Sequence, residues 1–358
     1  MARTQEQEAL MRTLRLVAPG TRLYEGLENI LRARTGALIV VGDSEQIERI
    51  VNGGFRLNTD LDPSGLYELA KMDGAIILSG DAQRILVANA HLTPDPMIPT
   101  SETGTRHRTA ERAAVQTNEL VIAISQRRNI ITLYKGGQRY VLREIGTILV
   151  KANQALQTLE RYRTVLQKTL ANLSALEFED AATVGDVCTA VQRAEVVARI
   201  AAEIELYICE LGTEGRLVSM QLEELLSDVE DEGFYVLRDY AAAGEENDAA
   251  AIRAELAEVT AEDLLDANVI LRFLGHPPGI SPETPVSARG YRLLRKIPRL
   301  PTPVIDNLIE VFGGLQKILA ATTDDLDEVE GIGEVRARAI QEGLRRLREQ
   351  AALDRFTP

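Results

Sequence analysis

Two short segments near the N-terminus combine residue types that could do chemistry. The first is Asp73-Gly74-Ala75, which follows a helical pattern and precedes an apolar run. A carboxylate at a strand edge can bind a divalent metal or a hydroxyl group, and the glycine after it lets a ligand approach the backbone closely. The alternative is a plain turn, because Asp-Gly is among the commonest turn dipeptides. Taken alone, this segment favours the turn.

The second segment is SETGTRHRT, residues 101–109, and a helical pattern follows it directly. Backbone N–H groups at a helix N-terminus, together with hydroxyl and guanidinium groups, make an anion-binding site. Arginines in the first turn of a helix are otherwise unfavourable, because the helix dipole repels cations there. The segment therefore favours a phosphate site over a charged surface. Its candidate residues are Thr105, Arg106, His107, Arg108 and Thr109.

The elements that must position these residues form an α/β pattern up to residue 146. Strands are predicted at Ala37–Val41, Gly54–Asn58, Ala75–Ser79, Arg84–Leu92, Leu120–Ser125, Ile130–Tyr134 and Arg139–Leu142, with helices at 44–52, 63–71 and 109–117. The residues between the last two strands, Lys135-Gly136-Gly137-Gln138, are typical of a tight hairpin. Interleaved strands and helices with a terminal hairpin indicate a mixed-sheet domain over residues 1–146.

The pattern changes near residue 147. Apolar residues repeat at steps of three and four from Leu149 to Leu173, interrupted by Arg163, which predicts a long helix with a narrow apolar stripe. Another helix is predicted from Thr183, whose capping partner would be Asp186. We expect residues 147–286 to be a helical linker and assembly domain, in which nothing suggests chemistry.

A Pro/Gly-rich stretch, Gly275–Pro285, is the predicted linker to an all-helical tail at residues 287–358. In that tail, the segment from Val329 to Glu334 fits a hairpin whose glycines bring backbone N–H groups to a DNA phosphate. Ile297–Pro301 resembles a degenerate copy of it. The candidate DNA-binding residues are Gly331, Gly333, Arg336 and Arg338.

Contacts with phosphates read no bases, so the expected target of the tail is branched, non-sequence-specific DNA. The alternative is a module used only for protein packing. Net charge is −14, but residues 289–358 hold 12 Lys+Arg against 11 Asp+Glu. Five cations follow one another without an intervening acid, and we expect the DNA phosphate backbone to contact the protein there, because counterion release favours clustered cations. The alternative is a solvated helix face. The five cations are Arg289, Arg292, Arg295, Lys296 and Arg299.

Length and composition limit the class of protein. A chain of 358 residues suggests two or three domains, and 45% hydrophobic with 26% charged residues is ordinary for a globular protein. No apolar run approaches the roughly 20 residues that span a bilayer, and the N-terminus lacks the apolar core of a secretion signal. Cys188 and Cys209 lack the spacing of a zinc site and are expected to be free thiols. We expect a cytoplasmic protein without a membrane partner.

Four segments, in this order and spacing, resemble the diadenylate cyclase family: GALIVVGD, KMDGAIILS, SETGTRHRTAER and SQRRNIITLY. Asp-Gly-Ala and Arg-His-Arg about 30 residues apart are specific in combination, although each is weak alone. With the helical middle and the hairpin tail, the likeness extends over essentially the whole chain. It is similar to the bacterial members of the family that join this domain to a DNA-binding module.

The resemblance implies that the protein condenses two ATP molecules into cyclic di-AMP and two pyrophosphates, with Mg²⁺ or Mn²⁺. Asp73 would bind the metal and the attacking 3′-hydroxyl, with Gly74 and Ala75 against the nucleotide. Residues 105–109 would bind phosphate. Ser125 would lie near the phosphates, and the backbone of Leu92 would contact adenine.

One domain has motifs for a single nucleotide, so two domains must face each other across a two-fold axis. The resemblance implies a homo-octamer assembled partly through the helical middle. Two alternatives stay open: a catalytically inactive DNA-binding scaffold, and a sensor that binds cyclic di-AMP without making it.

Overall fold

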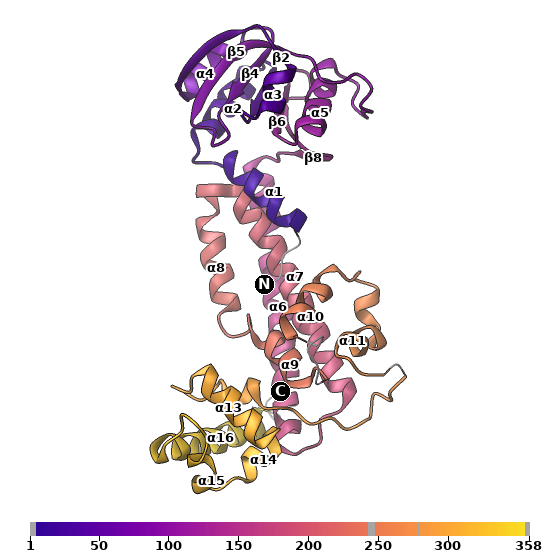
Figure 1. Cartoon of the computed structure of the whole chain (residues 1–358), viewed down its shortest axis with the longest axis vertical. Helices are drawn as coiled ribbons and strands as arrows, with labels where there is room; N and C mark the ends of the chain where they lie inside the picture. The colour runs from indigo at the N-terminus through magenta and orange to yellow at the C-terminus, as the bar shows by residue number, and fades with distance from the viewer. Residues whose placement is uncertain (1–4, 243–247, 278, 355–358) are drawn as a thin grey trace. The chain divides into compact units, whose positions relative to one another are not determined.

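The computed structural model describes residues 5–242, 248–277 and 279–354, and the chain divides into two compact units (Figure 1). The first, called here the sheet unit, comprises Glu6–Asn153 and Glu205–Ser219. The second, called the helical unit, includes Gln154–Ile204 and Met220–Pro358. Each unit is described by itself below.

The sheet unit is built on one mixed eight-stranded sheet in the order β2-β5-β4-β1-β6-β7-β8, with β3 paired to β5. The β1–β4 pair is parallel and the other pairs are antiparallel. The strands are β1 (Ala37–Val41), β2 (Val51–Asn52), β3 (Phe55–Asp60), β4 (Ala75–Leu78), β5 (Arg84–Leu92), β6 (Leu120–Ser125), β7 (Ile130–Lys135) and β8 (Gln138–Val141). The predicted mixed sheet is therefore confirmed, as is the hairpin between β7 and β8, where Lys135 pairs with Gln138.

Helices cover both faces of this sheet. Helices α1 (Gln5–Leu16), α2 (Arg22–Arg32) and α4 (Pro63–Ala70) pack on the face that carries Ile39 and Ile122. Helices α3 (Glu45–Ile50) and α5 (Thr105–Thr117) pack on the opposite face, which carries Val40 and Val121 (Figure 1). Neighbouring strand residues point to opposite faces, so a strand covered on both sides is apolar throughout, as Ala37–Val41 is.

Helix α5 begins four residues before the predicted start. The prediction placed the helix at 109–117, whereas the first turn already forms at Thr105, with Gly104 as N-cap. The backbone N–H of Arg108 donates to the carbonyl of Gly104 at 2.9 Å. The early start was hidden because no Ser, Thr, Asp or Asn side chain caps this helix. It places the whole Arg-His-Arg triplet inside the first turn.

The two long predicted helices are confirmed as α6 (Ile145–Phe178) and α7 (Val184–Leu211). The apolar stripe of α6 is buried at 152, 156, 159, 166, 170 and 173, while Leu149 is half-buried. Asp186 accepts hydrogen bonds from the backbone and hydroxyl of Thr183, the expected cap of α7. Helix α7 ends at Leu211, because Gly212 takes a φ of 53° that other residues rarely adopt.

The remaining helices of the middle region are short. They are η1 (Gly212–Gly215), α8 (Arg216–Leu226), α9 (Glu232–Tyr240), α10 (Ala249–Glu258), η2 (Asp263–Leu265) and α11 (Ala267–Phe273). The predicted linker, Gly275–Pro285, forms backbone hydrogen bonds with the start of α7. Gly185 N–H donates to Pro282 O at 2.8 Å and Val184 N–H to Thr284 O at 3.0 Å.

The tail is helical, as predicted, and contains two turns of similar sequence, called here the first hairpin (Ile297–Pro301) and the second hairpin (Val329–Gly333), each followed by a helix. The helices are α12 (Tyr291–Leu294), α13 (Thr302–Phe312), α14 (Leu315–Ala320), α15 (Thr323–Asp327) and α16 (Glu334–Asp354). Arg299 in the first hairpin and Gly331 in the second both have a positive φ, of 61° and 85°. The flanking apolar residues are buried in both hairpins, at 297 and 300 and at 329 and 332. The predicted degenerate copy thus has the same backbone turn.

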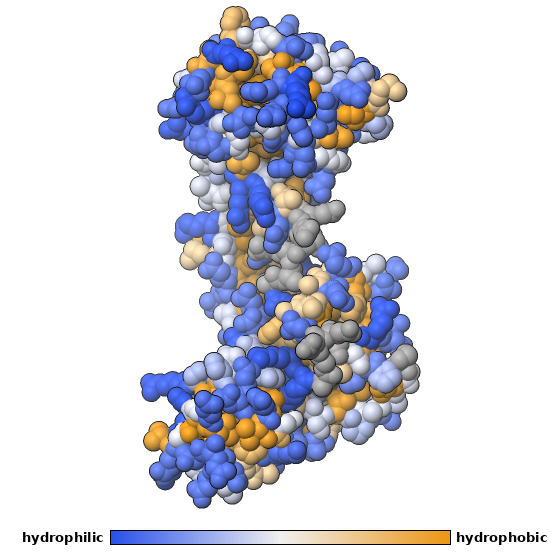
Figure 2. Space-filling model, in the orientation of Figure 1, coloured by the Kyte–Doolittle hydropathy of each residue, from blue (hydrophilic) through white to orange (hydrophobic). Residues whose placement is uncertain are grey.

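Across the described ranges, no helix combines the length and apolarity needed to cross a membrane. Hydrophilic residues cover most of the surface in Figure 2, with apolar residues gathered locally over the tail. Exposed apolar side chains there include Val311 and Val335, 64% and 85% exposed. Both cysteines are buried and neither forms a disulfide, as expected.

Candidate nucleotide site

The register of the sheet brings the predicted site residues to one edge. Because β1 and β4 are parallel, with Leu38 opposite Ala75, the residues preceding each strand lie at the same edge. Those residues are Gly36 and Asp73-Gly74. These two segments are far apart in the sequence, and only the strand order brings them side by side.

The antiparallel neighbours end at the same edge. In β6, Ile124 lies opposite Ala37, so Ser125 at the end of that strand is placed beside Gly36. In β5, Ala90 lies opposite Ala75, so Leu92 at its end is placed beyond Asp73. The edge therefore collects the Asp73 carboxylate and the Ser125 hydroxyl, which accepts from the backbone N–H of Arg128 at 3.2 Å, and both groups suit a polar ligand.

Gly74 is explained by the fold alone. Its φ is 113°, and a Cβ there would lie 2.9 Å from the carbonyl oxygen of Ala90. Strand β5 approaches this point closely, so no ligand is needed to account for the glycine. The side chain of Ala75 is buried, 1% exposed, in the core beneath α5. Contact of Ala75 with a nucleotide would therefore use its backbone.

The N-terminus of α5 supplies anion-binding groups. Gly104 has no side chain to cap the first turn, so the helix dipole and the early N–H groups face outward. Thr105 and Arg108 are exposed, whereas Arg106, His107 and Thr109 are half-buried. Arg106 and Arg108 thus lie in the first turn of α5, where the helix dipole disfavours cations. This arrangement supports an anionic ligand at the start of the helix.

Arg106 lies against Gly36 at the same edge of the sheet, a contact that the sequence did not predict. A Cβ built on Gly36 would overlap the Nη1 atom of Arg106, with the carbonyl of Ile124 3.2 Å away. The guanidinium therefore lies across the start of β1, next to the end of β6. The only sequence signal was a glycine directly before a buried strand, which is too common to identify the contact.

We expect Gly36→Ala to weaken nucleotide binding about 10- to 100-fold, because the added methyl group displaces a guanidinium whose charged hydrogen bond contributes about 1.5–3 kcal/mol. Calorimetric titration of the full chain with ATP measures this. The control is Gly137→Ala, since nothing lies within 4 Å of a Cβ at that turn position. Equal ATP affinity in the two variants would remove Arg106 from the site.

A hydrogen-bonded chain ends on His107. Its Nδ1 lies 2.9 Å from the hydroxyl of Tyr134, which donates to Glu102 Oε1 at 2.8 Å, and Arg139 Nε donates to the same oxygen at 2.7 Å. Sequence reasoning identified His107 and missed the other three. Glu102 and Tyr134 lie inside the quoted segments SETGTRHRTAER and SQRRNIITLY, but nothing local in the sequence indicates that these two residues and Arg139 meet.

Asp73 is exposed, and no group of three or more His, Cys, Asp or Glu side chains in the described ranges could hold a metal ion by itself. Mg²⁺ is commonly held by one or two carboxylates plus substrate phosphates, so a single exposed carboxylate is compatible with a metal ion that a nucleotide brings. Asp73 is the residue that would hold such an ion.

In the tail, the second hairpin has the predicted backbone geometry. Gly331 takes the positive φ, and Arg336 N–H donates to Gly333 O at 2.8 Å at the start of α16. The guanidinium of Arg336 folds back on the carbonyl of Gly331, and Arg338 pairs with Glu334 one turn earlier. Both arginines stay on the side of the hairpin that solvent reaches.

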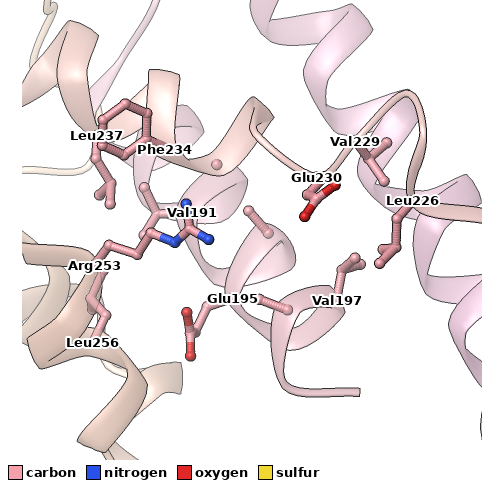
Figure 3. Close-up of a pocket in the computed structure, with 13 residues that line it drawn as sticks. Val191, Glu195, Val197, Leu226, Val229, Glu230, Phe234, Leu237, Arg253 and Leu256 are labelled. Atoms are coloured by element: carbon pink, nitrogen blue, oxygen red, sulfur yellow. The ribbon is translucent and has the colours of Figure 1, made fainter. Parts of the chain in front are cut away.

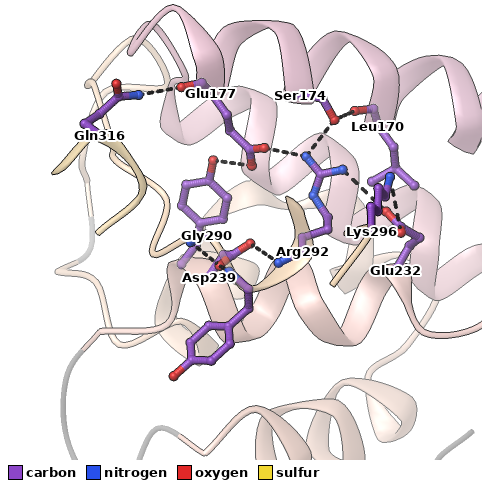
Figure 4. Close-up of polar contacts among 11 residues, drawn as sticks. Leu170, Ser174, Glu177, Glu232, Asp239, Gly290, Arg292, Lys296 and Gln316 are labelled. Carbon is purple, nitrogen blue, oxygen red and sulfur yellow. Dashed lines mark hydrogen bonds and ion pairs between the residues drawn. The ribbon is translucent and has the colours of Figure 1, made fainter. Parts of the chain in front are cut away.

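The prediction that the cation run at 289–299 contacts a phosphate backbone is wrong for its central member. Arg292 is fully buried and pairs with Glu177 at 2.5 Å (Figure 4). Arg289 donates to the backbone carbonyls of Arg238 and Ala241, and Arg295 pairs with Asp231. Acids from α6 and the α9 region, over 50 residues away in sequence, thus pair with Arg292, Arg295 and Lys296, whereas Arg299 is exposed.

A small cavity of about 40 Å³ lies among α7, α8, α9 and α10 in the helical unit (Figure 3). Its walls are mostly aliphatic and contain none of the predicted site residues. Glu195 on its wall is already bound to Arg199 at 2.7 Å. The pocket therefore adds nothing chemical to the middle region.

Fold and site together define a nucleotide-binding α/β domain followed by a helical region. Residues 24–139 match the family model described as DisA bacterial checkpoint controller nucleotide-binding, and residues 142–282 match the DisA bacterial checkpoint controller linker region.

Curated relatives agree over nearly the full length. The chain is 60% identical over 351 residues to the DNA integrity scanning protein DisA of Symbiobacterium thermophilum, covering 98% of this chain and 99% of that protein. Identity is 59% over 346 residues to the protein of that name from Carboxydothermus hydrogenoformans, covering 96% and 98%. It is 56% over 352 residues for Clostridium kluyveri, covering 98% and 99%. The chain therefore belongs to the DisA family.

Proposed function

We propose that the sheet unit condenses two ATP molecules into cyclic di-AMP and two pyrophosphates. The observation that carries this proposal is the register that gathers Asp73, Ser125 and the Arg106 guanidinium at one sheet edge. A carboxylate next to an anion site is what attack of a hydroxyl on a phosphate requires. The family membership supports the same reaction.

In this mechanism, the 3′-oxygen of each ATP attacks the α-phosphorus of the other, and pyrophosphate leaves. Asp73 orients the attacking hydroxyl, while Arg106 and Arg108 offset charge on the phosphates and the leaving group. A bound divalent metal supplies further charge stabilisation. The residues at the edge serve one nucleotide, so two domains must face each other, and we extend this to assembly as a homo-octamer.

The decisive experiment is incubation of the full chain with ATP and Mg²⁺ or Mn²⁺, followed by chromatography of the products. We expect cyclic di-AMP and pyrophosphate in a 1:2 ratio, by the balance of the reaction. Binding of cyclic di-AMP without its formation would make the protein a sensor. Absence of both would leave a DNA-binding scaffold.

We also propose that the tail binds branched DNA through phosphates, in the cytoplasm, where ATP and the chromosome are both present. The duplicated hairpin turn supports this, because its backbone N–H groups stand at helix starts. Because Arg292 is buried, and Arg295 and Lys296 are paired with acids, we place the expected DNA contact mainly at the second hairpin and α16.

We expect Arg336→Glu combined with Arg338→Glu to weaken binding of a four-way DNA junction at least about 10-fold and to reduce the salt dependence by about two phosphate contacts. Fluorescence anisotropy at several salt concentrations measures both quantities. Lys317→Glu, which reverses one exposed cation on α14, is the control for charge reversal outside this surface. An unchanged salt slope in the double variant would exclude this surface.

A further inference from the structure

The hydrogen-bonded chain behind His107 has no part in the mechanism above. Its members come from four places: the loop before α5, helix α5 itself, β7 and β8. Glu102 is 37 residues from Arg139 and 32 from Tyr134, so the fold assembles the chain. The side chain of Glu102 is 10% exposed and Tyr134 is 1% exposed, which shields both from water.

The positions of the protons follow from the partners. Burial opposes ionisation of Glu102, but hydrogen bonds from Tyr134 and Arg139 hold its pKa below the ordinary value. Burial and Glu102 together raise the pKa of Tyr134 well above 10. A carboxylate can only accept, so the tyrosine O–H must point at Glu102. The oxygen of Tyr134 is then left to accept a hydrogen bond from His107 Nδ1.

The charge on His107 is set by its surroundings. Burial lowers the pKa of His107 below 6.5, and Arg128, Arg106 and Arg139 act in the same direction against Glu102. The imidazole is therefore neutral at pH 7. With its proton on Nδ1, the Nε2 atom carries a lone pair.

We propose that Glu102 and Tyr134 are positioning residues that hold His107 as the neutral Nδ1–H tautomer and present Nε2 as a hydrogen-bond acceptor. The ligand group that it fits is a donor on the nucleotide, either a ribose hydroxyl or the adenine amino group. This rests on the proposed function only in taking ATP as the ligand. It revises the expectation that His107 contacts phosphate, since a lone pair repels an anion and the arginines already supply the cations.

The tautomer can be observed without catalysis. The chain has three histidines, so full-length protein labelled with ¹⁵N only at histidine gives three imidazoles in solid-state NMR. The His107 signals are assigned by their loss in His107→Gln. We expect a protonated Nδ1 and a bare Nε2 at pH 7.5. A proton on Nε2, or on both nitrogens, would overturn the proposal even if the protein makes cyclic di-AMP.

Tyr134→Phe keeps the ring and removes only the hydroxyl. We expect the imidazole proton of His107 to distribute over Nδ1 and Nε2 in this variant. The apparent Kd for ATP should rise about 3- to 10-fold, because a smaller fraction of the protein has the Nδ1–H tautomer that binds ATP. Glu102→Gln retains an oxygen that can accept from Tyr134, so it should lose less affinity than Glu102→Ala. Equal losses of ATP affinity in Glu102→Gln and Glu102→Ala would indicate a merely structural role for Glu102. They would contradict the proposed positioning of His107 through Tyr134.

The pH dependence distinguishes an acceptor from a cation. Protonation of Nε2 destroys the acceptor, so ATP affinity of the wild type, divided by that of His107→Gln at each pH, should fall as pH drops from 7.5 to 5.5. The ratio cancels titration of ATP itself. A ratio that rises over this range would show His107 binding phosphate as a cation and would refute the assignment.

Discussion

Asp73→Asn is expected to reduce cyclic di-AMP formation at least about 100-fold while ATP still binds, because the amide keeps the shape and loses the charge that orients the attacking hydroxyl. Affinity should survive, since in the proposed mechanism the guanidinium groups at the start of α5 provide most of the phosphate contact. The register places Asp73 at the edge where Gly36 and Ser125 meet. Initial rates and calorimetric ATP titration measure the two effects.

A matched control is available on the same strand. Asp81 is exposed in the turn at the other end of β4, where it accepts from the hydroxyl of Ser79 at 2.6 Å and from the backbone of Gln83. Asp81→Asn removes the same charge far from the proposed edge and should leave the rate within about two-fold, as for an ordinary surface substitution. Full activity in Asp73→Asn would take this carboxylate out of the mechanism.

Arg292→Ala should destabilise the helical unit by about 3–5 kcal/mol, because it leaves buried carboxyl groups without their cation. Arg292 donates to Glu177 and Ser174, and Glu177 also accepts from Tyr240 at 2.9 Å (Figure 4). Beside it, Asp239 accepts from the backbone N–H groups of 290, 291 and 292 and so holds the start of α12. Unfolding followed by circular dichroism in urea measures the loss.

The control for this variant is Arg295→Ala. Arg295 pairs with Asp231 at 2.9 Å, but both side chains are about half exposed, at 45% and 47%. An exposed pair contributes only about 0–1 kcal/mol, so the two variants should differ several-fold in their cost. Equal destabilisation by Arg292→Ala and Arg295→Ala would mean that the buried Arg292–Glu177 pair does not stabilise the helical unit more than an exposed pair does.

The effect of Arg292→Ala should grow with pH. Burial, followed by repulsion from Glu177, raises the pKa of Asp239 to about 7 in the intact protein. A carboxyl whose pKa is higher in the folded than in the unfolded state stabilises the fold at low pH and loses that contribution as pH rises through the folded value. Without the guanidinium this pKa rises further. Unfolding of the variant at pH 6 and pH 8 tests the sign.

Local patterns were sufficient for much of the architecture. The strands Ala37–Val41, Arg84–Leu92 and Leu120–Ser125 have the predicted bounds, because alternation and β-branched composition act over neighbouring residues. The cap formed by Thr183 and Asp186 is equally local. The paired motifs around Asp73 and residues 106–108 were also enough to identify the family.

The sequence by itself thus determined most of the strands, the long helices α6 and α7, and most of the residue types of the proposed site. Only the tertiary structure decided which of them meet. It brought the guanidinium of Arg106 against Gly36 and the hydroxyl of Tyr134 within hydrogen-bonding distance of His107. It also paired Arg292 with Glu177, which lies 115 residues away in sequence. Such partners depend on strand register and helix packing, which sum many weak contacts over the whole chain. A run of cations or a lone tyrosine therefore looks the same in sequence whether solvent or a buried acid neutralises it.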